Sequence, residues 1–253
     1  MIRAYHEVAA RWWYDEFMAD AQRVASRTEW LAARRALLAR EKELTRARDA
    51  LAAERRALPW LRVEKSYVFE GPDGKESLAD LFAGRSQLLV YHFMYPDDWT
   101  DACKSCSFWA DGYDGTLPHL AARDVTLVAV SISPYAKLEA FRRRMGWRFK
   151  WVSSAGSDFN RDFGVSFSKD EIESKAKLYN FGTQPFGVSE APGASVLAKD
   201  ARGDVFLTYQ CFARGLDPLN PAYQLLDLVP KGRDEDGLPY PMDWLRHRDR
   251  YGK

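Results

Sequence analysis

Hydrophobic and polar residues follow a helical spacing over residues 27–58. Ser26 is followed three residues later by Glu29, the pattern of a capping box, and this pair predicts the start of a helix. No proline or glycine follows until Pro59, so one long helix is expected. Large apolar side chains recur on this helix every seven residues: Trp30, Leu37, Leu44, Leu51 and Leu58. This spacing is typical of a helix that packs against another helix, the domain body or a dimer partner.

The segment before this helix, residues 1–24, mixes aromatic and charged residues and predicts an amphipathic helix. Together the two segments define a helical N-terminal extension, residues 1–62, with a possible role in homodimerisation. Residues 63–253 are expected to form a second domain that ends in a tail rich in proline, glycine and aspartate.

From residue 67 the spacing changes to that of strands alternating with short helices. Two near-continuous apolar runs, residues 88–95 and 125–131, predict strands that are covered on both faces, as in a parallel sheet. After the second run, Ser133 and Pro134 can begin a helix that Gly146 ends. Strand, helix and strand at this spacing favour an α/β fold over a β-sandwich.

Two later segments predict an antiparallel hairpin. Residues 195–199 and 205–209 are rich in apolar and β-branched side chains, and a glycine-containing turn lies between them. Pro192 lies just before this hairpin, separated from its first strand by two residues.

Composition excludes several classes of function. The 253 residues include 37 basic and 36 acidic side chains, a net charge of +1, which gives no reason to expect binding to nucleic acid or to an anionic membrane. No apolar run reaches the roughly 20 residues of a membrane span. Three cysteines do not form a secreted disulfide framework, and the first residues contain no apolar core of signal-peptide length. A cytoplasmic protein is expected.

The sharpest chemical signal follows the first buried run, which is stopped by Pro96. Cys103 and Cys106 lie where that strand leads into a predicted helix, and backbone N–H groups at a helix start favour a thiolate over a thiol. A C-x-x-C motif in this position is the layout of a redox dithiol. It predicts thiol–disulfide exchange, in which Cys103 attacks a disulfide substrate or a small-molecule oxidant and Cys106 resolves the product, without a cofactor.

Two alternatives use the same residues. The spacing from Pro96 to Thr100 to Cys103 matches the peroxiredoxin signature, in which the threonine holds a peroxide beside the thiolate; residues 192–194, however, stand where that family has its activating arginine. A metal or cofactor module is the other alternative, with Cys103, Cys106, Cys211 and His92 as the ligand set if a metal binds.

Four residues are candidates for a supporting role at the dithiol. His92 lies in the strand that precedes it and is either a hydrogen-bonded core residue or a base near Cys103. Lys104 would lower the pKa of the neighbouring thiol. Trp99 and Pro192 complete this set.

Several longer motifs occur between residue 29 and residue 160. They are EWLAAR (29–34), EKELT (41–45), RRALPW (55–60), YHFM (91–94), C-x-x-CSFWAD (103–111), RMGW (144–147) and DFN (158–160). With these motifs the chain, from about Glu29 to the end, resembles a thioredoxin-like bacterial family called domain of unknown function 899, a neighbour of the peroxiredoxins. The resemblance implies a thioredoxin-like sheet with flanking helices but supplies no reaction.

The chain departs from that family at a few positions. Lys104 stands where relatives carry a proline, and Leu207 stands where they carry a histidine. Cys211 lies within a Gln-Cys-Phe run in place of Ser-Thr-Tyr, and His247 is followed by an arginine in place of a second histidine. A metal or proton relay built on those histidines would be incomplete in this chain.

Overall fold

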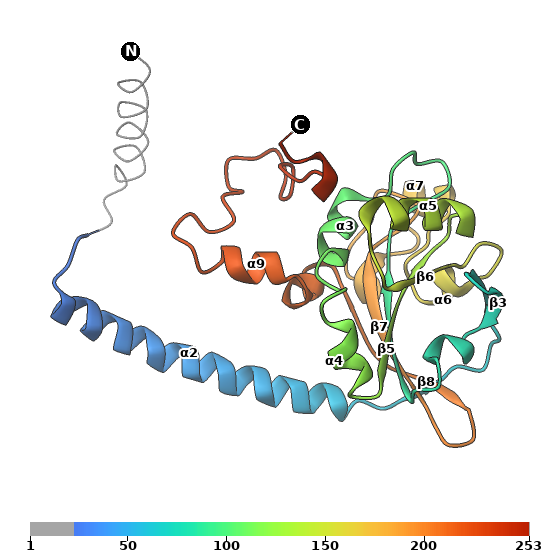
Figure 1. Cartoon of the computed structure of the whole chain (residues 1–253), viewed down its shortest axis with the longest axis horizontal. Coiled ribbons are helices and arrows are strands. Elements are labelled where there is room, and N and C mark those ends of the chain that lie inside the picture. Colours follow the sequence, from blue (N-terminus) through green and yellow to red (C-terminus); the bar gives the residue numbers. More distant parts are fainter. Residues whose placement is uncertain (1–22, 253) are drawn as a thin grey trace, which may run out of the picture. The chain divides into compact units, whose positions relative to one another are not determined.

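The computed structural model describes residues 23–252, and Figure 1 shows its elements. The amphipathic helix expected over residues 1–24 falls almost wholly outside the described residues. The chain divides into two compact units, Met1–Ala57 and Leu58–Lys253. Within the described range, no helix has the length and apolar character needed to cross a membrane.

The first unit contains one long helix, α2 (Arg27–Arg56). The Ser26 hydroxyl accepts a hydrogen bond from the Glu29 N–H at 3.3 Å, and the Glu29 carboxylate accepts one from the Ser26 N–H at 2.9 Å. The expected capping box is therefore confirmed. The helix ends at Arg56, three residues before Pro59, and none of its residues is buried.

The second unit is built around one eight-stranded sheet with the order β1-β8-β7-β4-β5-β6-β2-β3. The central strand β4 pairs in parallel with β5 and antiparallel with β7, and it leads into the helix that carries the two cysteines. This arrangement is thioredoxin-like and confirms the expected fold class. The strands are β1 (Leu61–Arg62), β2 (Val68–Gly71), β3 (Gly74–Ser77), β4 (Gln87–His92), β5 (Val125–Ser131), β6 (Lys150–Ser153), β7 (Gly193–Lys199) and β8 (Val205–Phe212).

Helices cover both faces of the sheet, which explains why the central strands are apolar throughout. On one face, α3, α4 and α5 pack over a core that contains Tyr91, Ala129 and Trp151. On the other face, η1 and α6 pack over Val90 and Val128. The helices are η1 (Asp80–Phe82), α3 (Lys104–Ala110), α4 (Leu117–Ala121), α5 (Tyr135–Met145), α6 (Phe159–Asp162), α7 (Lys169–Ser174) and α8 (Tyr179–Gly182).

The closing hairpin is longer than the sequence predicts. β7 begins at Gly193 rather than residue 195, so Pro192 directly precedes the strand. A side chain at Gly193 would meet the Phe212 ring at 2.7 Å, so the strand contains glycine where β8 approaches closely. The register of β7 and β8 shifts next to Thr208, which is an extra residue in β8.

A long tail completes the second unit, and Figure 1 draws it in orange and red beside α3. It contains η2 (Ala213–Leu219), α9 (Pro221–Leu226) and η3 (Arg248–Arg250), joined by loop. The Lys104 ammonium donates to the Asp243 carbonyl at 3.0 Å, and the His247 ring is 2.9 Å from the Ala102 carbonyl. The tail is therefore fixed to both sides of Cys103.

Candidate functional site

The two cysteines lie at the start of α3, as the sequence predicts. Cys103 is the N-cap residue: its N–H donates to the Met94 carbonyl at 3.2 Å, and its sulfur accepts from the Cys106 N–H at 3.4 Å. Cys103 is half-buried, whereas Cys106 is 2% exposed. One sulfur can therefore be reached and the other lies behind it.

The hydrogen bond between the two sulfurs moves the pKa values of the two thiols in opposite directions. The Cys106 thiol donates to the Cys103 sulfur, and this bond is the main reason that the pKa of Cys103 falls from 9.0 to about 7. Burial opposes the shift, while the backbone N–H groups of Cys106 and Ser105 add to it. Burial and the same shared bond raise the pKa of Cys106. Near neutral pH a large fraction of Cys103 is therefore a thiolate that accepts a hydrogen bond from the Cys106 thiol.

Aromatic and polar contacts hold this end of α3 in place. The Tyr91 hydroxyl donates to the Cys106 carbonyl at 3.3 Å, and the Ser107 hydroxyl donates to the Cys103 carbonyl at 2.9 Å. The Trp109 indole N–H donates to the Leu216 carbonyl of the tail at 2.8 Å. These bonds fix the backbone that carries both sulfurs.

A cavity of about 1020 Å³ opens at the dithiol. Its walls come from the end of β4, from α3, from residues 179–192 and from the tail. Pro192 is part of this wall, as the sequence suggested, and the Tyr179 hydroxyl donates to its carbonyl. The apolar and sulfur-containing part of the lining consists of Tyr91, Met94, Cys103, Cys106, Trp109, Tyr179, Phe186, Pro192, Ala213, Leu216, Tyr223, Pro241 and Met242.

His92 is not at the dithiol. Successive side chains of a strand point to opposite faces, so Tyr91 lies on the face of α3 and His92 lies on the other. The His92 ring contacts the rings of Phe159 and Phe163, with centroids 5.7 and 5.9 Å away, and shares a 2.7 Å hydrogen bond with the Ser195 hydroxyl. Burial lowers the pKa of His92 to about 3. The expected alternative of a base near Cys103 is corrected to a neutral core histidine.

Three other candidates also lie away from the cavity. The Lys104 ammonium points to the tail, where it bonds the Asp243 carbonyl and lies 5.8 Å from the Tyr240 ring centroid, and so it is not directed at the thiolate. Trp99 is half-buried against the core on the side of α3. Thr100 is exposed, and neither residue belongs to the cavity lining.

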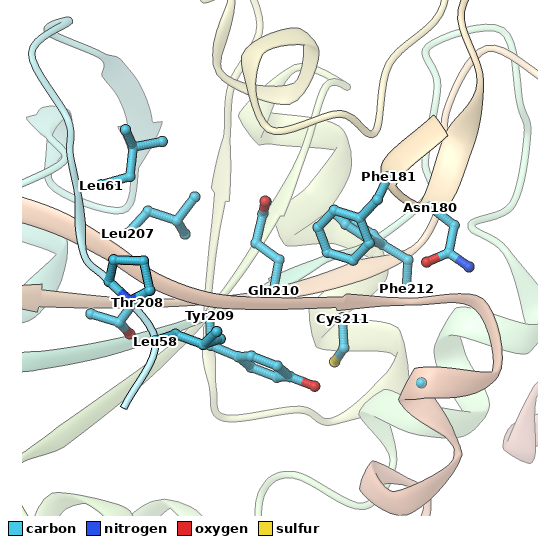
Figure 2. A pocket seen from close by; sticks show the side chains of 12 residues that line it. Leu58, Leu61, Asn180, Phe181, Leu207, Thr208, Tyr209, Gln210, Cys211 and Phe212 are labelled. Atoms are coloured by element: carbon cyan, nitrogen blue, oxygen red, sulfur yellow. The ribbon is translucent and has the colours of Figure 1, made fainter. Parts of the chain in front are cut away.

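The four residues considered as metal ligands are not brought together. Within residues 23–252, no group of three or more His, Cys, Asp or Glu side chains is placed to hold a metal ion. Cys211 lies on β8 and lines a separate pocket of about 570 Å³, which Figure 2 shows. In that view its sulfur projects from the same side of the strand as Tyr209, while Gln210 and Phe212 project from the other side.

Sequence reasoning missed the tail as part of the site. Residues 213–242 supply more than half of the cavity lining, although the sequence predicted this segment only as a tail rich in proline, glycine and aspartate. Its aromatic residues, such as Tyr223, were the available signal. Tyr179 and Phe186 were also missed. Tyr179 begins the four-residue helix α8 and Phe186 lies in the loop after it, and an element this short leaves no periodic spacing in the sequence.

Comparison with known proteins identifies the family. The model of a family described as bacterial proteins of unknown function, DUF899, matches residues 19–251. The chain belongs to this family. A search of curated proteins found no match. The DUF899 match includes the dithiol, the sheet and nearly all of the tail.

Solved structures that resemble this DUF899 member include several peroxiredoxins. A mitochondrial 2-Cys peroxiredoxin from Plasmodium falciparum is 12% identical, with a TM-score of 0.41, over 66% of this chain and 94% of that chain. A peroxiredoxin Q from Xanthomonas campestris is 14% identical, with a TM-score of 0.41, over 64% and 94%. Peroxidoxin BcpB from Mycobacterium tuberculosis is 12% identical, with a TM-score of 0.38, over 64% and 92%. At these values the likeness carries no information about reaction or substrate.

Proposed function

We propose that this protein is a thiol–disulfide oxidoreductase that uses Cys103 and Cys106. One observation carries the proposal: a reachable sulfur with a pKa of about 7 accepts a hydrogen bond from a buried thiol in the same turn of chain. This pairing gives one sulfur the role of nucleophile and the other the role of resolving thiol.

The reaction needs two displacements. The Cys103 thiolate attacks one sulfur of a substrate disulfide, forms a mixed disulfide and releases the other sulfur as a thiolate, which takes a proton from water. The Cys106 sulfur then attacks Cys103, forms the intramolecular disulfide and releases the second substrate thiol, which receives the Cys106 proton. The substrate gains two electrons and the dithiol loses two, and an external thiol must later reduce the protein.

The structure favours this reaction over the two alternatives. In a peroxidase of peroxiredoxin type the threonine hydroxyl would meet the peroxide beside the thiolate, but Thr100 is exposed and outside the cavity lining. A metal site built on the dithiol would need further ligands, and His92 lies across the sheet from Cys103. The proposed setting is the cytoplasm, where thiols are kept reduced.

Redox titration tests the proposal. The protein is equilibrated in dithiothreitol or glutathione buffers, and its thiols are then alkylated and counted by mass. We expect the count to fall reversibly from three to one, leaving Cys211, with a midpoint between about −270 and −120 mV. A Cys211→Ser variant should show the same midpoint with a count that falls from two to none. Failure to form an intramolecular disulfide at any potential would refute exchange by this pair.

A further inference from the structure

Residues 213–242 of the tail cover the dithiol, and we call this segment the roof. Residues 213–242 face α3 and residues 179–192 across the cavity of about 1020 Å³, so Cys103 lies inside a walled space and not on a flat surface. Pockets that hold small organic molecules commonly measure about 300–1,000 Å³. A folded protein must present its disulfide to the attacking sulfur, and a roof obstructs that approach.

Polar contacts, most of them partly buried, hold the tail together above the dithiol. The Glu235 carboxylate accepts hydrogen bonds from the Tyr223 hydroxyl at 2.8 Å, the Trp244 indole at 2.7 Å and the Met242 N–H at 3.0 Å. Arg233 makes a second set of contacts within the tail. It pairs with both Asp217 and Asp227 at 2.8–3.0 Å and stacks on the Tyr223 ring, 3.9 Å from its centroid.

The same contacts decide what the cavity can bind. Arg233 pairs with Asp217 and Asp227, Arg214 also pairs with Asp217, and Glu235 is occupied by three donors. The other charged side chains of the lining belong to the tail: Lys231, Asp234 and Asp236. The part of the lining that α3 and residues 179–192 contribute is mostly aromatic or apolar, with Trp109 and Phe186 among its members. Such a lining favours a ligand with an apolar body, because burying it removes apolar area from water on both partners.

We propose that the substrate is a small organic disulfide with an aromatic or apolar body, and not the disulfide of a folded protein. This inference rests on the proposed exchange reaction and adds its substrate class. The apolar body occupies the space between α3 and the tail, which places the sulfur to be attacked at Cys103 and excludes water from the mixed disulfide.

Three oxidants test this substrate class on the reduced full-length protein. Benzyl 2-hydroxyethyl disulfide and bis(2-hydroxyethyl) disulfide share a leaving group and differ in the apolar body; insulin supplies protein disulfides. Each rate of thiol loss is divided by the rate of the same oxidant with N-acetylcysteine. We expect the benzyl compound to react at least about tenfold faster than the hydroxyethyl compound on this scale. Insulin should be the slowest.

Variants connect the preference to the cavity and to its roof. Phe186→Ala should remove most of the benzyl preference, while Phe181→Ala, which changes an aromatic residue outside this lining, should keep it. Glu235→Ala removes the acceptor of three roof bonds and should speed the reaction with insulin. Glu70→Ala, which removes an exposed carboxylate of β2 outside this lining, is its control. Circular dichroism verifies folding of each variant.

The outcomes separate the two proposals. If no oxidant consumes the Cys103 and Cys106 thiols, the exchange reaction itself is wrong. If all three react at similar normalised rates, exchange stands and the substrate class is overturned. A benzyl preference that survives in Phe186→Ala also overturns the assignment of this cavity.

A separate observation concerns the first unit. Large apolar side chains recur every seven residues on α2, and we call this series the stripe. The stripe is exposed: the exposed fractions are 57% for Trp30, 49% for Leu37, 54% for Leu44 and 45% for Leu51. Isolated helices gain stability in water chiefly by packing such a face. The position three residues after each stripe member also faces the same side of the helix. These positions hold Ala33, Arg40, Ala47 and Glu54.

We infer that α2 of a second copy covers this stripe in an antiparallel pair. With Leu44 of one helix opposite Ala47 of the other, Arg40 lies within one turn of the partner's Glu54, and the symmetry provides this pairing twice. A parallel pair in register would bring each Arg40 level with another Arg40. Charge complementarity therefore selects the antiparallel arrangement.

Sedimentation of the full chain tests the pair. The protein should be a dimer, Leu44→Glu should weaken dimerisation by at least about tenfold, and Ala39→Glu, on the far side of α2, should not. Arg40→Glu and Glu54→Arg should each weaken the dimer, and the double exchange should restore it. A monomeric protein, or a dimer that Leu44→Glu leaves intact, would overturn the inference. A double exchange without recovery would overturn the antiparallel orientation.

Discussion

Replacement of Cys103 by serine should lower the rate of reaction with disulfides on the order of 10³-fold or more. A serine hydroxyl remains protonated at neutral pH, whereas the Cys103 thiol, with a pKa of about 7, is half thiolate there. The remaining thiols cannot replace it, since Cys106 and Cys211 are both buried. The measurement is the single-turnover rate of thiol loss with bis(2-hydroxyethyl) disulfide.

Cys106→Ser should give a different result, because the first displacement remains possible. The mixed disulfide on Cys103 then has no resolving thiol, so mass spectrometry should find one substrate half bound per chain. Cys211→Ser should react as the unaltered protein does. An unaltered rate in Cys103→Ser would remove that residue from the role of nucleophile, and stable adducts on Cys106 in Cys103→Ser would reverse the two assignments.

Alkylation of Cys103 should depend on pH with a midpoint near 7. A lowered pKa means that the thiolate persists to lower pH than in an ordinary cysteine, so the rate stays high above pH 7 and falls below it. With only the thiolate reactive, the rate should fall about 100-fold from pH 8 to pH 5. Iodoacetamide labelling of Cys211→Ser, read by peptide mass, measures this profile.

The variants of Cys106 identify the cause of the lowered pKa. Cys106→Ala removes the thiol that donates to the Cys103 sulfur and should move the midpoint upward, towards 9.0. Cys106→Ser keeps a donor at the same position and should move it less. A midpoint that stays near 7 in Cys106→Ala would mean that the backbone N–H groups alone hold the thiolate.

Local signals predicted those parts of the fold that depend on local physics. Ser26 and Glu29 mark the start of α2, and Gly146, in a left-handed conformation, ends α5. The apolar run of residues 125–131 coincides with β5. The position of Cys103 at the start of a helix follows from the same reasoning, because strand, turn and helix are consecutive in the chain.

Other features depend on contacts between distant segments. β4 is covered on both faces, so its apolar pattern does not tell which side His92 faces; a shift by one residue exchanges the two faces. Lys104 is adjacent to Cys103 in sequence, yet its direction is set by the Asp243 carbonyl. The short strand β3 was missed as well, because Gly74–Ser77 contains no apolar side chain that could alternate with its polar ones.

The buried contact of His92 also bears on the alignment of the strands. Its ring meets the Ser195 hydroxyl of β7, which accepts a further bond from the Gln210 amide of β8 at 3.1 Å. A slip of β4 by two residues would keep every side chain on its own face but would move the strand by about 7 Å. The slip would leave these polar groups unsatisfied inside the core, which is costly. The histidine thus fixes the register of β4 against β7. It keeps the end of the strand that leads to Cys103 beside Gly193, the residue after Pro192.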